Sequence, residues 1–70
     1  MHELAIASEV IRIALESVPS DRDANILCIN IEIGELSCVQ SESLEFAFQA
    51  LSKATPLENA KLNITRIEPL

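Results

Sequence analysis

The fold of this chain is decided by residues 26–33, which read ILCINIEI. Every second residue of the stretch is a large aliphatic one, and these residues share one side of an extended strand: Leu27, Ile29, Ile31 and Ile33. Such alternation is typical of a strand with one buried face. Gly34, the only glycine in the chain, follows at once, and we expect it to supply a backbone conformation that other residues resist.

Before this strand, residues 4–18 have the periodicity of an amphipathic helix. The apolar stripe contains Leu4, Ala7, Ile11, Ala14, Leu15 and Val18, and it is widened by Ile6, Val10 and Ile13. Glu9, Arg12 and Glu16 lie on the opposite face, at spacings that allow ion pairs within the helix. Pro19 is expected to end the helix, and a polar turn follows it.

After the strand, residues 34–40 are expected to form a loop, and a second helix begins near Ser41. One face of this helix carries Leu44, Ala47, Phe48 and Leu51, with Phe46 and Ala50 beside it. We predict that both phenylalanines belong to the core. Residues 54–57, which read ATPL, are expected to break the helix.

Residues 61–67, KLNITRI, alternate again and predict a second strand. The order is therefore α-β-α-β in a single domain spanning residues 1–70. One broad apolar stripe per helix and one apolar strand face predict the fold class α/β (α+β), a two-layer sandwich with both helices on one face of a small sheet. A crossover that contains a helix favours parallel strands, although an antiparallel pair stays open.

Composition limits the functions that this chain can have. The formal net charge of −6 argues against nucleic acid and anionic membranes as partners. A hydrophobic content of 49% is high for 70 residues, which indicates apolar surface for a partner or a second copy. Cys28 and Cys38 match no CxxC motif, so we expect reduced thiols. Without a basic stretch ahead of residues 4–18, we expect no signal sequence and a cytoplasmic protein.

The chemistry of the chain is expected at its first three residues, Met1, His2 and Glu3. The α-amine, the His2 amide nitrogen and the His2 Nδ1 atom can bind one metal ion in two fused chelate rings. The position opposite the amide would be filled by the Glu3 amide, the Glu3 carboxylate or another side chain. A planar, nitrogen-rich set favours Ni(II) or Cu(II) over Zn(II). The alternative is that a histidine stands beside the initial methionine by chance.

Four motifs in order resemble the hydrogenase nickel-incorporation proteins, the HypA/HybF family. They are Met-His-Glu at residues 1–3, IGELS at 33–37, LEFAF at 44–48 and AKLNI at 60–64. The resemblance covers the nickel-binding half of the family. It implies a metallochaperone that delivers Ni(II) during maturation of nickel-iron hydrogenase, with a nickel-handling GTPase and the hydrogenase large subunit as partners. It also implies that Met1 binds nickel through its amine, His2 as the essential ligand and Glu3 through its backbone or carboxylate.

The family pattern continues into a zinc domain with two CxxC pairs, followed by a returning strand that completes the sheet. This sequence has no CxxC, so we expect no zinc in this chain. Gln40 stands where an acidic side chain is common in the family, so no carboxylate ligand is expected from that position. Because a sheet of two strands is marginal alone, we predict a homodimer or higher oligomer.

A different function remains open, that of a small acidic protein-protein interaction domain without a metal. An enzyme is not expected. The chain has one histidine, no recognisable Ser-His-Asp set and no glycine-rich phosphate loop, so it offers little for acid-base catalysis beyond scattered carboxylates.

Overall fold

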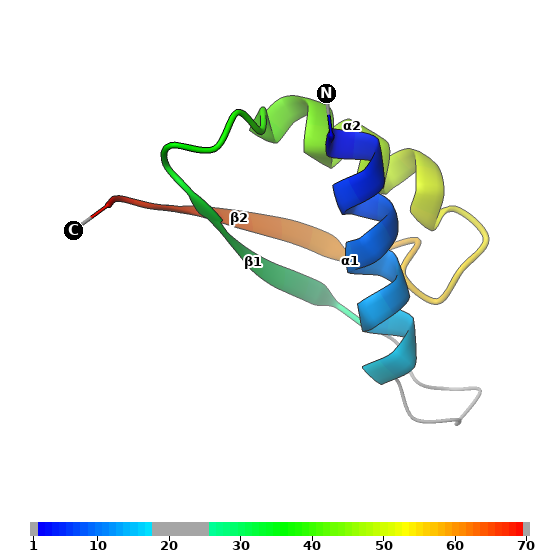
Figure 1. Ribbon diagram of the computed structural model, residues 1–70. Coiled ribbons are helices and arrows are strands. Elements are labelled where there is room, and N and C mark those ends of the chain that lie inside the picture. Colours follow the sequence, from blue (N-terminus) through cyan, green and yellow to red (C-terminus); the bar gives the residue numbers. More distant parts are fainter. Residues whose placement is uncertain (1, 18–25, 70) are drawn as a thin grey trace.

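The structure is a computed structural model that describes residues 2–17 and 26–69. Its elements are α1 (Glu3–Ser17), β1 (Cys28–Gly34), α2 (Ser41–Ser52) and β2 (Lys61–Ile67). The predicted α-β-α-β order is therefore confirmed (Figure 1). The predicted helix end at Pro19 and the turn after it lie outside the described residues.

The two strands pair in parallel, which is the arrangement that the helical crossover favours. The register runs from Cys28 opposite Lys61 to Gly34 opposite Ile67. One backbone hydrogen bond extends the ladder beyond each end, from Lys61 N to Leu27 O and from Glu35 N to Ile67 O. Because paired residues face the same side, the odd-numbered residues of β1 lie on the same face as the even-numbered residues of β2.

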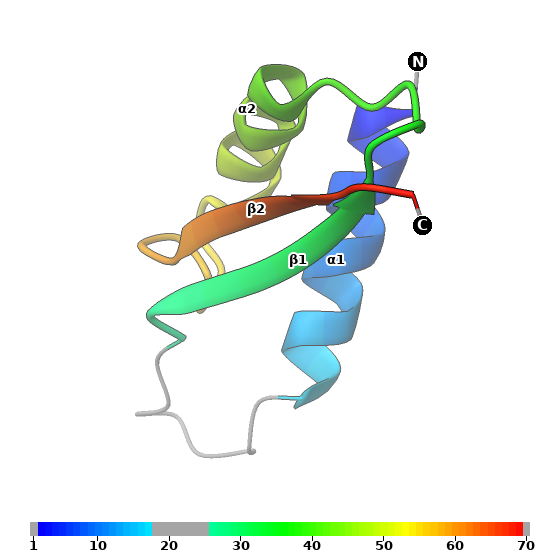
Figure 2. The same cartoon turned by 90° about the vertical axis from the view of Figure 1, so that its left-hand side faces the viewer.

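Both helices lie on one side of this sheet, as the sequence predicted (Figures 1 and 2). The inward side chains of the strands pack on a core that both helices contribute to; its buried members are Ala7, Ile11, Leu44, Ala47, Phe48, Leu57 and Leu62. The outward side of the sheet is polar. At its centre Asn63 Nδ2 donates a hydrogen bond of 3.0 Å to Asn30 Oδ1.

The prediction that both phenylalanines are in the core is wrong for one of them. Phe48 is 2% exposed, whereas Phe46 is 74% exposed. A helix turns about 100° per residue, so a side chain two positions away from both Leu44 and Phe48 points away from the face that they share. The α2 stripe is therefore narrower than its composition suggests.

Three further apolar residues are more exposed than their pattern predicted: Leu27, Leu4 and Leu15. Leu27 lies just before β1 and is 80% exposed, outside the group of side chains that pack on the core. In α1, Leu4 and Leu15 are exposed, whereas Ala7 and Ile11 are buried. This helix packs mainly on α2 through the line of Ala7 and Ile11, so the flank with Leu4 and Leu15 stays in solvent.

Gly34 does not have the backbone role expected of it. It has no positive φ, and nothing lies within 4 Å of the position that a Cβ atom would take. The left-handed conformation instead occurs at Ala54, with a φ of 62°, just after the end of α2. A glycine is the usual residue at such a helix end, so alanine there is strained.

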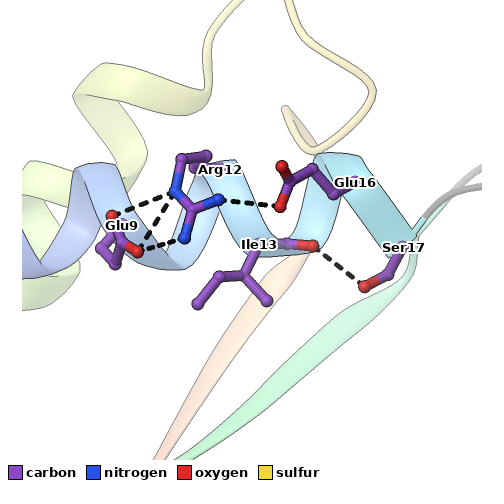
Figure 3. A network of polar contacts seen from close by, with 5 residues as sticks. All are labelled: Glu9, Arg12, Ile13, Glu16 and Ser17. Carbon is purple, nitrogen blue, oxygen red and sulfur yellow. Dashed lines mark hydrogen bonds and ion pairs between the residues drawn. The ribbon is translucent and has the colours of Figure 1, made fainter.

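The exposed face of α1 carries the ion pairs that its spacing predicted (Figure 3). Arg12 pairs with Glu9 one turn before it and with Glu16 one turn after it, the latter at 2.8 Å. The Arg12 guanidinium lowers the pKa of the Glu9 carboxyl. Across the described ranges, no helix is both long enough and apolar enough to cross a membrane.

Candidate metal centre

The amino-terminal end of α1 positions the residues that the sequence singled out. His2 is exposed and directly precedes the helix, and its carbonyl accepts the first helical hydrogen bond from Ile6 N at 2.9 Å. The first four N–H groups at a helix start have no partner within the helix. The His2 and Glu3 amides are among them, so neither nitrogen is committed to the hydrogen-bond ladder of α1.

Glu3 is turned inward, although it is a charged residue in the first turn of a helix. It is 7% exposed, and its Oε2 atom accepts a hydrogen bond of 3.0 Å from the backbone N–H of Gln40. The Gln40 N–H, followed by the amide of Glu3 itself, lowers the pKa of the Glu3 carboxyl. Gln40 is the N-cap of α2, so this carboxylate joins the starts of the two helices. A negative charge is favourable at both.

The loop that carries Gln40 is held from its other side by Arg66 of β2. The Arg66 guanidinium donates to the carbonyl of Val39 and, over 3.1 Å, to Ser41 Oγ. Arg66 stands opposite Ile33 in the sheet and is half-buried. Residues 39–41 are therefore fixed by α1 and by β2 together.

A shallow hollow of about 360 Å³ lies beside this contact, lined by Glu3, Cys38, Gln40 and Ser43. Cys38 and the other cysteine, Cys28, are both exposed free thiols, as expected. Cys28 is on the outward side of β1, whereas Cys38 borders the hollow. The hollow therefore borders the start of α1 through Glu3.

The three predicted site residues have different positions. Met1 lies outside the described residues, His2 is at the surface, and the Glu3 carboxylate faces inward. Within residues 2–17 and 26–69, no group of three or more His, Cys, Asp or Glu side chains is arranged to hold a metal ion. What the start of α1 offers a metal is an imidazole next to main-chain nitrogens.

Arg66 was not among the site residues predicted from the sequence. A signal for it was present, because Leu62 and Ile64 occupy the inward positions of the second strand and the next inward position is Arg66. A charged residue in an apolar row either lies at the end of the core or has a polar partner inside. Arg66 lies at the end of the core and also has polar partners there, the Val39 carbonyl and Ser41 Oγ.

Comparison with known proteins defines the class to which this domain belongs. All of residues 1–70 match a family model described as "Hydrogenase/urease nickel incorporation, metallochaperone, hypA". That class consists of metallochaperones and maturation factors, which are not enzymes, in agreement with the sequence analysis. The chain belongs to the HypA family.

Individual relatives agree with this assignment. The chain is 43% identical over 67 residues to a hydrogenase maturation factor HypA of Geotalea daltonii, covering 96% of this chain and 58% of that protein. The HypA of Desulfatibacillum aliphaticivorans is 37% identical over 68 residues, with coverages of 96% and 52%. That of Methanocaldococcus jannaschii is 34% identical over 74 residues, with coverages of 99% and 60%. The chain thus spans a little over half the length of these relatives.

Proposed function

We propose that this chain carries Ni(II) as cargo at its amino terminus and delivers it during hydrogenase maturation. The ligands would be the Met1 amine, the His2 amide nitrogen and His2 Nδ1. The observation that carries the proposal is the placement of His2 and Glu3 at the start of a helix, where their amides lie outside the helical ladder. The positive end of the helix dipole favours negative charge, so it favours the loss of an amide proton to a metal.

In this proposal the Glu3 carboxylate is not a nickel ligand. It already accepts the Gln40 N–H, and the bond of a carboxylate to a backbone amide is a strong one. Coordination through the carboxylate would require that this bond be broken. We therefore assign the carboxylate to holding the terminus and leave to Glu3 a main-chain contribution.

The coordination position opposite the His2 amide suits a metal carrier if the ligand there is bound only weakly. A receiving protein could then bind the metal at that position before the chelate releases it. The hollow lined by Glu3, Cys38 and Gln40 gives such a ligand a route of approach. Ni(II) is preferred over Zn(II) in this proposal because a plane of nitrogen ligands suits nickel.

Partner binding completes the proposal. Several large apolar side chains are exposed, above all Leu36 at 81%, Leu27 at 80% and Phe46 at 74%. Such residues are what a protein partner would cover. A nickel-handling GTPase and the hydrogenase large subunit are the partners we propose. The two free thiols fit delivery in the cytoplasm, where thiols stay reduced. The same surface is also what an interaction domain without a metal would use.

A nickel titration of chains with different termini separates the two functions. The authentic terminus should bind one Ni(II), and His2→Ala should lose more than the roughly 10–100-fold that removal of an outer partner costs a metal site. The blocked control should carry three extra residues before Met1. A single extra residue would put the imidazole third in the chain and create a complete four-nitrogen chelate of its own. If the three-residue extension binds nickel like the authentic chain, the proposed function is wrong.

A further inference from the structure

One peptide unit, that between Val39 and Gln40, is bound by a charged side chain at each end. Its carbonyl accepts a hydrogen bond from the Arg66 guanidinium, and its N–H donates to the Glu3 carboxylate over 3.0 Å. The guanidinium comes from β2 and the carboxylate from α1. This single amide therefore connects a cation and an anion that lie far apart in the sequence.

The geometry of a peptide unit makes the two bonds mutually supportive. In a trans peptide the C=O and the N–H point in opposite directions, and no cis peptide occurs in the described residues. A cation on the oxygen polarises the amide and makes its N–H a better donor to the carboxylate. Hydrogen bonds in such a chain strengthen one another, most of all where solvent is excluded. Glu3 is buried, so this condition is met at its end of the chain.

The surroundings of Arg66 indicate that its main role is to bind the loop that contains Val39. Among the residues that the structure describes, no carboxylate forms an ion pair with it, and its partners are the Val39 carbonyl and Ser41 Oγ. Its place in the inward row of β2 would suit an aliphatic side chain, as at Ile64. A half-buried charge at this position is costly unless its donors are used.

We propose that Arg66 is a positioning residue for the amino-terminal nickel site, acting through the Val39–Gln40 peptide unit to fix Glu3 and thereby the adjoining His2. The inference rests on the proposed nickel function and extends it to β2, which contributes no ligand. Loss of the guanidinium would free the peptide unit, weaken the bond to Glu3 and let the first turn of α1 move. The nickel ligands would then become ordered only when the metal binds, and the cost of ordering them would weaken nickel binding.

The test compares two arginine variants of equal charge. Arg66→Met should weaken Ni(II) binding about tenfold, the lower end of what outer partners of metal ligands contribute. Arg12→Met removes the same charge from the exposed face of α1, where Arg12 binds Glu9 and Glu16, and should leave nickel affinity unchanged. Arg66→Lys keeps the charge and N–H donors but lacks the planar guanidinium fork, so it should restore part of the affinity. Thermal unfolding of each variant identifies any that fails to fold.

Coupling to Glu3 distinguishes positioning from a general structural role. If both side chains act through one peptide unit, the double variant with Glu3→Gln and Arg66→Met should bind nickel no more weakly than Glu3→Gln alone. Additive losses would contradict the inference. In the metal-free protein, the Gln40 amide proton should exchange with solvent faster in Arg66→Met than in wild type, and equal exchange rates would contradict it too.

The outcomes separate this inference from the function on which it rests. If the authentic chain binds nickel, the extended chain does not, and Arg66→Met binds like wild type, then the nickel site stands and the role of Arg66 is wrong. If the authentic chain itself binds no nickel, both proposals are wrong. The Gln40 exchange rates then still show whether Arg66 holds the loop.

Discussion

At the scale of single residues, the buried Glu3 carboxylate holds the start of α1 against the loop before α2, through the 3.0 Å bond from the Gln40 N–H. The sequence alone identifies His2 as a possible metal ligand, because the chelate involves only atoms of adjacent residues. The role of the Glu3 carboxylate depends on Gln40, 37 positions away, and no local pattern indicates that contact. Arg66 was missed for the same reason, since its partners belong to the loop before α2.

Glu3 should make the stability of the protein depend on acid pH. Its pKa is lower in the folded protein than the ordinary value of 4.5, because the carboxylate accepts the Gln40 N–H. The stabilisation is therefore present above about pH 4.5 and is lost as the pH falls below that value and the carboxylate becomes protonated. Glu3→Gln should be less stable at neutral pH and should lose less stability on acidification. Urea unfolding at a series of pH values measures both effects.

Glu9→Gln is the matched control for this prediction. The pKa of Glu9 is also lowered, by Arg12, but both side chains of that pair are more than half exposed, so solvent and salt screen the interaction. Its loss should change the pH profile less than the loss of Glu3 does. A larger effect at Glu9 than at Glu3 would show that the bond to Gln40 contributes little in solution.

At the scale of the elements, sequence periodicity predicted the helices and strands but did not predict every side chain that packing buries. Both helices and both strands follow from periodicity, whereas the crossover only favoured the parallel pairing that the structure shows. The burial of Leu57 does not, because it lies in the segment predicted only as a helix break and yet is 0% exposed. Phe46 shows the opposite error, since a large aromatic residue beside an apolar stripe need not belong to it.

The two phenylalanines of α2 make a direct test of this packing. Phe48→Ala should cost about 3–5 kcal/mol, because a buried ring leaves a cavity. The free energy of unfolding of a small domain is roughly 5–15 kcal/mol, so this variant should be close to unfolded at 25 °C. Phe46→Ala should change stability by no more than about 0.5 kcal/mol, since the side chain is exposed. Equal losses in urea unfolding would mean that Phe46 is covered in solution.

Ala54 offers a stabilising change. Its left-handed φ of 62° costs an L-residue about 1–2 kcal/mol. Glycine avoids this cost but loses about 0.5–1 kcal/mol of chain entropy relative to alanine. Ala54→Gly should therefore raise the free energy of unfolding by roughly 0.5–1 kcal/mol. Gly34→Ala is the companion variant, and it should fold normally because open space surrounds its position.

At the scale of the whole molecule, the sheet is the feature that calls for a partner strand. The described residues form a two-stranded sheet, and each strand has one edge without a neighbour. Beside β1 lies an apolar hollow of about 190 Å³, lined by Val10, Ile13, Ala14, Ile29, Asn30 and Ile31. Sheets of two strands are marginal alone, and an open edge with apolar surroundings recruits another strand.

We therefore expect the 70-residue chain to form a homodimer or higher oligomer. Light scattering at micromolar concentration should give a mass above that of the 7.7 kDa chain, and the mass should fall on dilution. A monodisperse monomer with a complete, cooperative thermal transition would contradict this expectation. It would show that two helices and two strands form a stable core without further strands.

Nuclear magnetic resonance can show directly whether nickel binds at the amino terminus, because it maps the metal onto individual backbone amides. One equivalent of Ni(II) in a square plane is diamagnetic, so the amide signals of an isotopically labelled chain remain measurable. The signal of the His2 amide proton should be absent from the nickel complex, and the largest shifts should fall at Glu3 and Gln40. Shifts centred on Cys28 or Cys38, with the signals of residues 2–4 unchanged, would contradict it.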